Sequence, residues 1–163
     1  MAERPSRVWQ DMPLEKRVLA AEAFWQDEGS QEVEVQHMEA IAAIARRLKF
    51  RPKSVLALPV DRRSRQLAAL SDVADGVATS ALIAYHFQHQ RPLMAAFLDA
   101  LGIQHDNGLI TAEGVDPPDR DRLAQAVAVV RSTHQPDDVA LYLRTLAALD
   151  GETWSGVESV LDG

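Results

Sequence analysis

The sequence predicts an all-α protein: a single compact bundle of six to eight helices with mixed crossing angles, formed by residues 1–163 as one domain. Apolar residues recur at helical spacing along most of the chain, and strand-like alternation is nearly confined to Val33-Glu34-Val35. Prolines and glycines divide the chain into segments of unequal length, which argues against a simple up-down four-helix bundle. With 163 residues, 47% of them apolar and 25% charged, the chain has the length and composition of one ordinary globular domain.

Two long helices are predicted first. Residues 1–12 are polar enough to form a loose N-terminal arm, and Pro13 then favours a helix start because its ring fixes a helical φ angle. This helix ends near Asp27, before a glycine. Ser30 suits the N-cap of the second helix, which ends near Lys49 in a turn whose basic residues complement the negative end of the helix dipole.

Two short helices and the predicted central helix follow. Pro52 opens a short helix that Pro59 ends, since proline cannot continue an α-helix, and Asp61 caps the next one. The most apolar segment, Asp72–His89, carries apolar side chains on two faces. A helix that is apolar on two faces is buried on both, so we expect this one at the centre of the bundle.

The C-terminal half is predicted to hold one irregular segment and four helices. Pro92 and Gly102 bound a compact helix over residues 93–101. Residues 102–116 contain three glycines and are expected to be irregular. Proline-containing starts then predict helices that begin near residues 116 and 135, and a last short helix covers residues 152–161.

Composition excludes several classes of function. The chain has no cysteine, which rules out disulfides, cysteine-bound zinc, iron–sulfur clusters and thiol catalysis. It shows neither a signal peptide nor the ~18 apolar residues of a membrane span, so we expect a cytoplasmic protein with no membrane partner. No nucleophile elbow, phosphate loop or dinucleotide fingerprint is present, so no catalytic residue is assigned and no cofactor is predicted. Whether the protein is an enzyme stays open.

Positive charge is concentrated in one segment of this acidic chain. The net charge is −7, yet Asp61 is the only acid between Arg46 and Arg65. Residues 1–45 carry −5, residues 46–65 carry +7 and residues 66–163 carry −9 by formal charge. Such a segment must face negative charge on its own flanks, on a second copy or on a ligand. Its eight basic residues are Arg46, Arg47, Lys49, Arg51, Lys53, Arg62, Arg63 and Arg65.

The favoured hypothesis is a non-enzymatic protein-interaction or regulatory domain whose basic segment contacts an acidic protein partner or a second copy. Residues 52–70 have helix-turn-helix proportions and would place Arg62, Arg63 and Arg65 near the start of a recognition helix. The acidic flanks repel an extended polyanion, however, and the turn lacks glycine, so nucleic acid is disfavoured. Replacing these three arginines with alanine is expected to leave folding nearly intact.

A self-associating homodimer is one form of this hypothesis. Val129 points away from the apolar stripe of its predicted helix, and Leu141 and Ala148 do the same on the next helix. Two adjacent helices with a second apolar edge indicate burial on both sides, by the central helix or by another subunit.

The alternative is a small helical enzyme or metal-binding protein. Glu34 and His37 have the Glu-x-x-His spacing that carboxylate-bridged di-iron bundles use, but such bundles need a second copy of the motif, which is missing. His37, His86 and His89 could instead form a three-nitrogen set for Zn²⁺. Because the motif stands alone and cysteine is absent, we expect no stoichiometric transition metal.

His105-Asp106 resembles the His-Asp pair of the all-helical metal-dependent phosphohydrolases. That family presents the pair from a helix, with another histidine well upstream and an aspartate well downstream. Here the pair lies in a loop bounded by Gly102 and Gly108, and no separate histidine stands at a comparable distance. No function is therefore carried over, and we interpret Asp106 as a turn residue.

Overall fold

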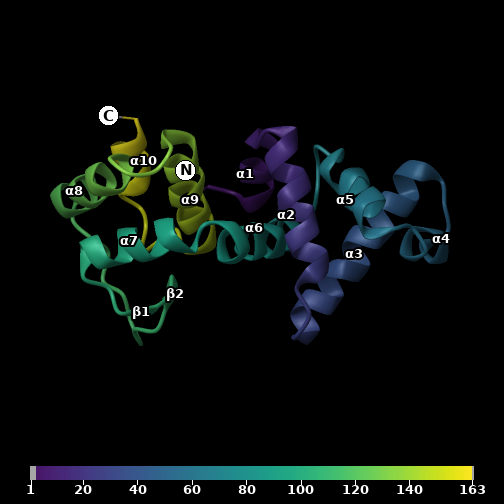
Figure 1. Ribbon diagram of the computed structural model, residues 1–163, viewed down its shortest axis with the longest axis horizontal. Coiled ribbons are helices and arrows are strands. Elements are labelled where there is room, and N and C mark those ends of the chain that lie inside the picture. Colours follow the sequence, from purple (N-terminus) through teal and green to yellow (C-terminus); the bar gives the residue numbers. More distant parts are fainter. Residues whose placement is uncertain (1–2, 163) are drawn as a thin grey trace. The chain divides into compact units, whose positions relative to one another are not determined.

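The computed structural model describes residues 3–162 and shows an all-α protein (Figure 1). Residues 3–162 are 68% helical and form ten helices, eight of which have seven residues or more. The predicted fold class is thus confirmed. None of these helices combines the length and the apolar character that crossing a membrane requires, within residues 3–162.

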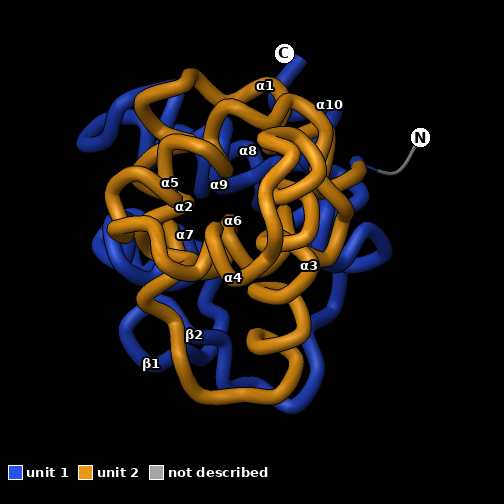
Figure 2. Tube along the Cα trace, turned by 90° about the vertical axis from the view of Figure 1, so that its right-hand side faces the viewer, with its two compact units in different colours: residues 1–3, 86–163 blue, residues 4–85 orange. Residues whose placement is uncertain are grey.

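The chain forms two compact units, which Figure 2 shows in different colours. We call residues 4–85 the N-terminal unit, and Glu3 together with residues 86–162 the C-terminal unit. The boundary at residues 85–86 falls inside a continuous helix, α6 (Asp75–His89). The arrangement of the two units as one domain stays a prediction, and each unit is described by itself.

The N-terminal unit consists of six helical elements. In it α2 packs against α5, and α3 packs against both α4 and α5. Its largest fully buried side chains include those of Trp9, Phe24, Ile41 and Ile44. The elements are α1 (Pro5–Asp11), α2 (Leu14–Gln26), α3 (Gln31–Leu48), α4 (Pro52–Leu56), α5 (Val60–Ala68) and the start of α6.

Helix α1 replaces most of the expected loose arm. Residues 5–12 were expected to be unstructured, but Pro5 sits in the first turn of a helix, and Val8, Trp9 and Met12 are buried. The indole N–H of Trp9 donates a hydrogen bond of 2.9 Å to the carbonyl of Leu70. A buried tryptophan with a satisfied N–H fixes the segment to the core. Residues 1 and 2 of the predicted arm lie outside the described residues.

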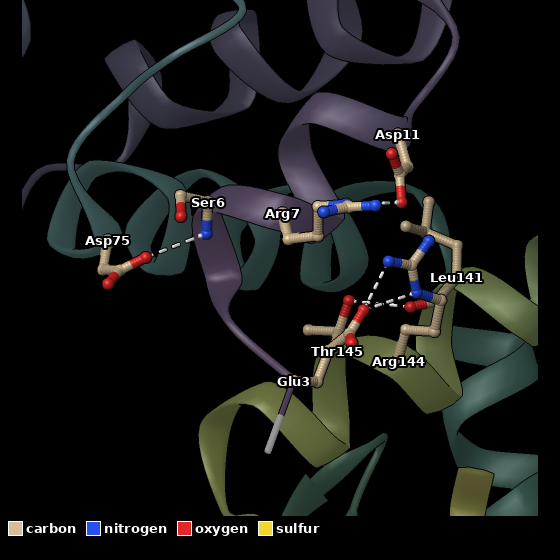
Figure 3. Close-up of polar contacts among 8 residues, drawn as sticks. All are labelled: Glu3, Ser6, Arg7, Asp11, Asp75, Leu141, Arg144 and Thr145. Carbon is tan, nitrogen blue, oxygen red and sulfur yellow. Dashed lines mark hydrogen bonds and ion pairs between the residues drawn. The ribbon is translucent and has the colours of Figure 1, made fainter. Parts of the chain in front are cut away.

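A polar contact joins α1 to the start of α6 within the N-terminal unit (Figure 3). The backbone N–H of Ser6 donates to Asp75 Oδ1 at 3.1 Å. Arg4 Nη2 lies 2.9 Å from Asp75 Oδ2. Hydrogen bonding from Ser6, then from Arg4, lowers the pKa of Asp75 from 3.8 to about 2. Donors and a cation beside a carboxylate favour its charged form.

The C-terminal unit is built around one apolar core. Helix α7 packs against α8, α10 packs against α8 and α9, and a short β-hairpin lies against α7. Phe97, Leu143 and Trp154 belong to this core. The elements after α6 are α7 (Arg91–Leu101), β1 (His105–Asp106), β2 (Leu109–Ile110), α8 (Arg120–Arg131), α9 (Pro136–Leu149) and α10 (Val157–Leu161).

The hairpin corrects the expectation of an irregular segment over residues 102–116. Strands β1 and β2 pair antiparallel, with His105 opposite Ile110. The turn between them has Asn107 at φ 48° and Gly108 at φ 95°. Two positive φ angles define the type I′ turn, for which Asn-Gly is the preferred sequence.

Two helix ends have the predicted capping residues, and two helix starts differ from the prediction. The Ser30 hydroxyl accepts from the N–H of Val33 at 3.2 Å, and Gly102 closes α7 at φ 70°, as predicted. Helix α8 begins at Arg120 rather than near residue 116, because the side chain of Asp119 caps it. Likewise Pro59, not Asp61, is the N-cap of α5.

Candidate functional site

The basic segment runs from the end of α3, through α4, into α5. Seven of its eight cationic side chains are exposed, and Arg63 alone is half-buried. Within residues 3–162, none of the eight forms an ion pair with a carboxylate. The acidic flanks of the sequence therefore do not neutralise these charges by direct contact.

Arg63 has a structural partner. Its guanidinium carbon lies 4.6 Å from the centre of the Trp25 ring, an arrangement in which the cation is attracted to the negative face of the aromatic system. Trp25 is itself buried. Arg63 is predicted to bind a partner together with Arg62 and Arg65. Its contact with Trp25 instead gives Arg63 a role in packing α5 on α2.

Exposed apolar side chains accompany the cations. Phe50, Leu56 and Val60 are 48%, 49% and 44% exposed, which is high for large apolar residues. Val55 of α4 points inward and is buried, so the short helix is fixed while Leu56 faces solvent. We call this set the basic–apolar surface: Arg46, Arg47, Lys49, Phe50, Arg51, Lys53, Leu56, Val60, Arg62 and Arg65.

Helix α5 presents its two exposed arginines on one side. Ser64, Leu67 and Ala68 are its buried residues, whereas Arg62 and Arg65 face solvent three positions apart. The preceding helix, α4, has only five residues. The segment thus offers two outward cations near the start of α5 rather than the three that the helix-turn-helix interpretation used.

His37 is held by the fold. Its Nε2 lies 2.6 Å from the backbone carbonyl of Phe24, to which a protonated Nε2 donates, and its ring packs on Phe24 and Trp25. Glu34, the other half of the Glu-x-x-His motif, is exposed. Among residues 3–162, no three histidine, aspartate or glutamate side chains are grouped so that they could hold a metal ion. The candidate ligands His37, His86 and His89 are therefore not brought together as a metal site.

His105 fixes the hairpin. Its Nδ1 accepts a hydrogen bond from the N–H of Gly108 at 3.1 Å, so its Nε2 carries the proton and donates to Asp99 Oδ1 at 2.6 Å. Nδ1 therefore holds the turn of the hairpin, and Nε2 joins the hairpin to α7. Asp106 is exposed in strand β1, next to the turn.

The predicted second apolar edge of the last long helices is only partly exposed. Val129 is exposed, as its position off the α8 stripe indicated. Leu141 is buried, and Ala148 is half-buried. A single exposed valine does not make a continuous apolar patch, so self-association through this edge stays a prediction.

A pocket in the C-terminal unit was not foreseen from the sequence. It has a volume of about 710 Å³ and lies along α9, the turn after it and α10. At its margin Glu3 forms an ion pair with Arg144, whose Nε lies 2.6 Å from Glu3 Oε1 (Figure 3). The residues that line the pocket range in sequence from Glu3 to Asp162, so no local sequence pattern could reveal it.

Comparison of the chain with protein-family models, with curated protein sequences and with solved structures gives no match in any of the three. The fold and the two surface features define the class of protein: an all-α protein with a basic–apolar surface in one unit and a mixed-charge pocket in the other.

Proposed function

We propose that this protein is a non-enzymatic protein-interaction module that binds an acidic protein partner through the basic–apolar surface. One observation carries the proposal: seven exposed cations have no carboxylate partner within residues 3–162, and three large apolar side chains are exposed in the same segment.

The two kinds of side chain contribute differently to binding. Exposed cations mainly speed and orient docking, and their effect falls with salt because the Debye length is about 8 Å at 0.15 M. Apolar contacts that become buried supply much of the affinity, although buried area alone does not set its size, because association and side-chain ordering cost free energy. Phe50, Leu56 and Val60 would serve this second role. The partner's segment therefore combines carboxylates with apolar side chains, as an acidic amphipathic helix does.

Duplex DNA fits these observations less well. Base reading in the major groove uses a recognition helix supported by a preceding helix, but α4 has only five residues. The sequence on both sides of the segment is also acidic, and it repels the phosphates of an extended duplex. A compact acidic protein surface avoids that repulsion.

The test compares three labelled probes by fluorescence anisotropy at 0.15 M salt. They are an acidic amphipathic helical peptide, the same peptide with glutamine in place of each glutamate, and a mixed-sequence DNA duplex. The acidic peptide should bind most tightly and weaken as salt rises. Replacing Lys53, Arg62 and Arg65 with alanine should weaken it at least tenfold, whereas Arg120→Ala, an exposed cation of the other unit, should not.

Two results would overturn the proposal. Tighter binding of the duplex than of the acidic peptide, lost in the triple variant, would favour a nucleic-acid regulator. Equal binding of the acidic and glutamine peptides would remove the electrostatic basis of the surface. Unchanged circular dichroism of the triple variant establishes that a loss of binding is not a loss of folding.

A further inference from the structure

The geometry points to a second binding function: we infer that the pocket of the C-terminal unit binds a small organic cation, a protonated amine attached to an aromatic or aliphatic body. This inference is independent of the basic–apolar surface, which lies in the other unit. It rests on the size of the pocket, its apolar floor and the sign of its unpaired charges.

The pocket has the dimensions and floor of a small-molecule site. Its volume of about 710 Å³ falls within the range of about 300–1,000 Å³ that such sites occupy. Trp154 and Val157 line it and belong to the buried core, while Ala140 and Ala147 contribute small apolar side chains from α9. A ligand body entering between α9 and α10 would therefore contact apolar side chains.

Four acids and two arginines line the pocket, so its net formal charge is −2 (4 acids against 2 bases). Arg144 is engaged by Glu3, which leaves Arg131 as the remaining cation of the lining. Three exposed carboxylates have no ion-pair partner within residues 3–162: Asp137, Glu158 and Asp162. Each of these carboxylates attracts a protonated amine and repels an anion.

Trp154 adds a hydrogen-bond donor to the lining. Trp154 lines the pocket, and the residue is only 3% exposed. Within residues 3–162, its indole N–H donates a hydrogen bond to no other residue. An indole N–H can only donate a hydrogen bond, so its partner must offer an acceptor. A ligand that carries an acceptor atom between its ring and its amine would supply one here.

The test uses three probes that share one aromatic ring and one ether oxygen but differ in head group: 2-phenoxyethylamine, 2-phenoxyethanol and phenoxyacetate. Binding to the full chain without tags is measured by calorimetry and by ligand-observed NMR, with dissociation constants near ~1 mM expected for fragments of this size. The amine should bind tightest, the alcohol more weakly and the carboxylate weakest.

Variants locate the binding. Asp137→Asn and Glu158→Gln should each weaken the amine about three- to tenfold and leave the alcohol unchanged, because only charge is removed. Glu113→Gln, an exposed acid outside the pocket, is the matched control and should change neither. Ala140→Trp should abolish binding of all three by filling the pocket. Tightest binding of phenoxyacetate, amine binding that survives Ala140→Trp in a folded variant, or no binding of the amine would each overturn the inference.

Discussion

The guanidinium of Arg63 lies over the ring of Trp25, at 4.6 Å from its centre. This contact divides the three arginines of α5 by function. Arg62 and Arg65 are exposed and available to a partner, whereas the guanidinium of the half-buried Arg63 lies over a buried tryptophan of α2. The three residues, although they lie within four positions of one another, should therefore respond differently to substitution.

Arg63→Ala is expected to lower the free energy of unfolding by about 1–2 kcal/mol, because it removes both the cation–π contact and the packing of the stem. Arg62→Ala should stay within about 0.5 kcal/mol of the parent, as exposed substitutions do. Urea denaturation followed by tryptophan fluorescence measures both. Equal stability of the two variants would show that the ring contact contributes nothing.

His37→Ala should also destabilise the protein, by about 1–2 kcal/mol, since it leaves the carbonyl of Phe24 without its donor and removes an aromatic contact. Glu34→Gln, one turn earlier on the same helix, is exposed and serves as the control with no expected change. Thermal denaturation compares the two. Elemental analysis of untagged protein should find no stoichiometric transition metal. About one equivalent of zinc or iron that is lost in His37→Ala would contradict the structural role.

The Asp75 contact predicts a loss of stability in acid. Its folded-state pKa of about 2 lies below the ordinary 3.8, so its stabilisation is complete above pH 3.8 and disappears as pH falls toward 2. The amount is about 1 kcal/mol or less, because both Arg4 and Asp75 reach solvent. Comparing Asp75→Asn with the parent by urea denaturation should give a constant difference at pH 5–7 that shrinks between about pH 4 and 2. A difference in the free energy of unfolding that grows in acid would contradict a folded-state pKa of Asp75 below 3.8.

Gly108→Ala is expected to destabilise the hairpin by about 1–2 kcal/mol. The backbone there has φ 95°, which L side chains rarely adopt, and an added Cβ would lie 3.0 Å from Met94 Cβ. Gly114→Ala is the matched control, because a Cβ there meets nothing within 4 Å. The control should be neutral or slightly stabilising. Chemical denaturation of both variants checks the pair, and equal effects would mean that the turn is not strained.

Local chemistry explains why most helices could be predicted. Ser30 and Gly102 act within one turn of chain, so their cap geometry follows from neighbouring residues alone. The Asn107-Gly108 turn is just as local, but it lies in a stretch with three glycines, whose composition favoured an irregular segment. Helix α1 was missed because its stability comes from burying Trp9 against distant residues rather than from its own seven positions.

The two surface features could be predicted to different degrees. The charge of residues 46–65 is visible in the sequence, and its exposure follows because charged side chains seldom leave water unpaired. The exception, Arg63, depends on a tryptophan 38 positions earlier. The pocket depends on tertiary packing throughout, since it combines Glu3 with residues of α9 and α10.

Glu3 and Asp162 line one pocket although nearly the whole chain separates them. A tag fused to either end of the chain is therefore attached close in sequence to a residue that lines that pocket. Such an extension is a tethered competitor, present at a local concentration that can reach the millimolar range for a short flexible linker. A lysine-rich tag would occupy the acidic rim, and an acidic tag would avoid it. The choice of tag thus becomes a chemical variable in every binding measurement on this protein.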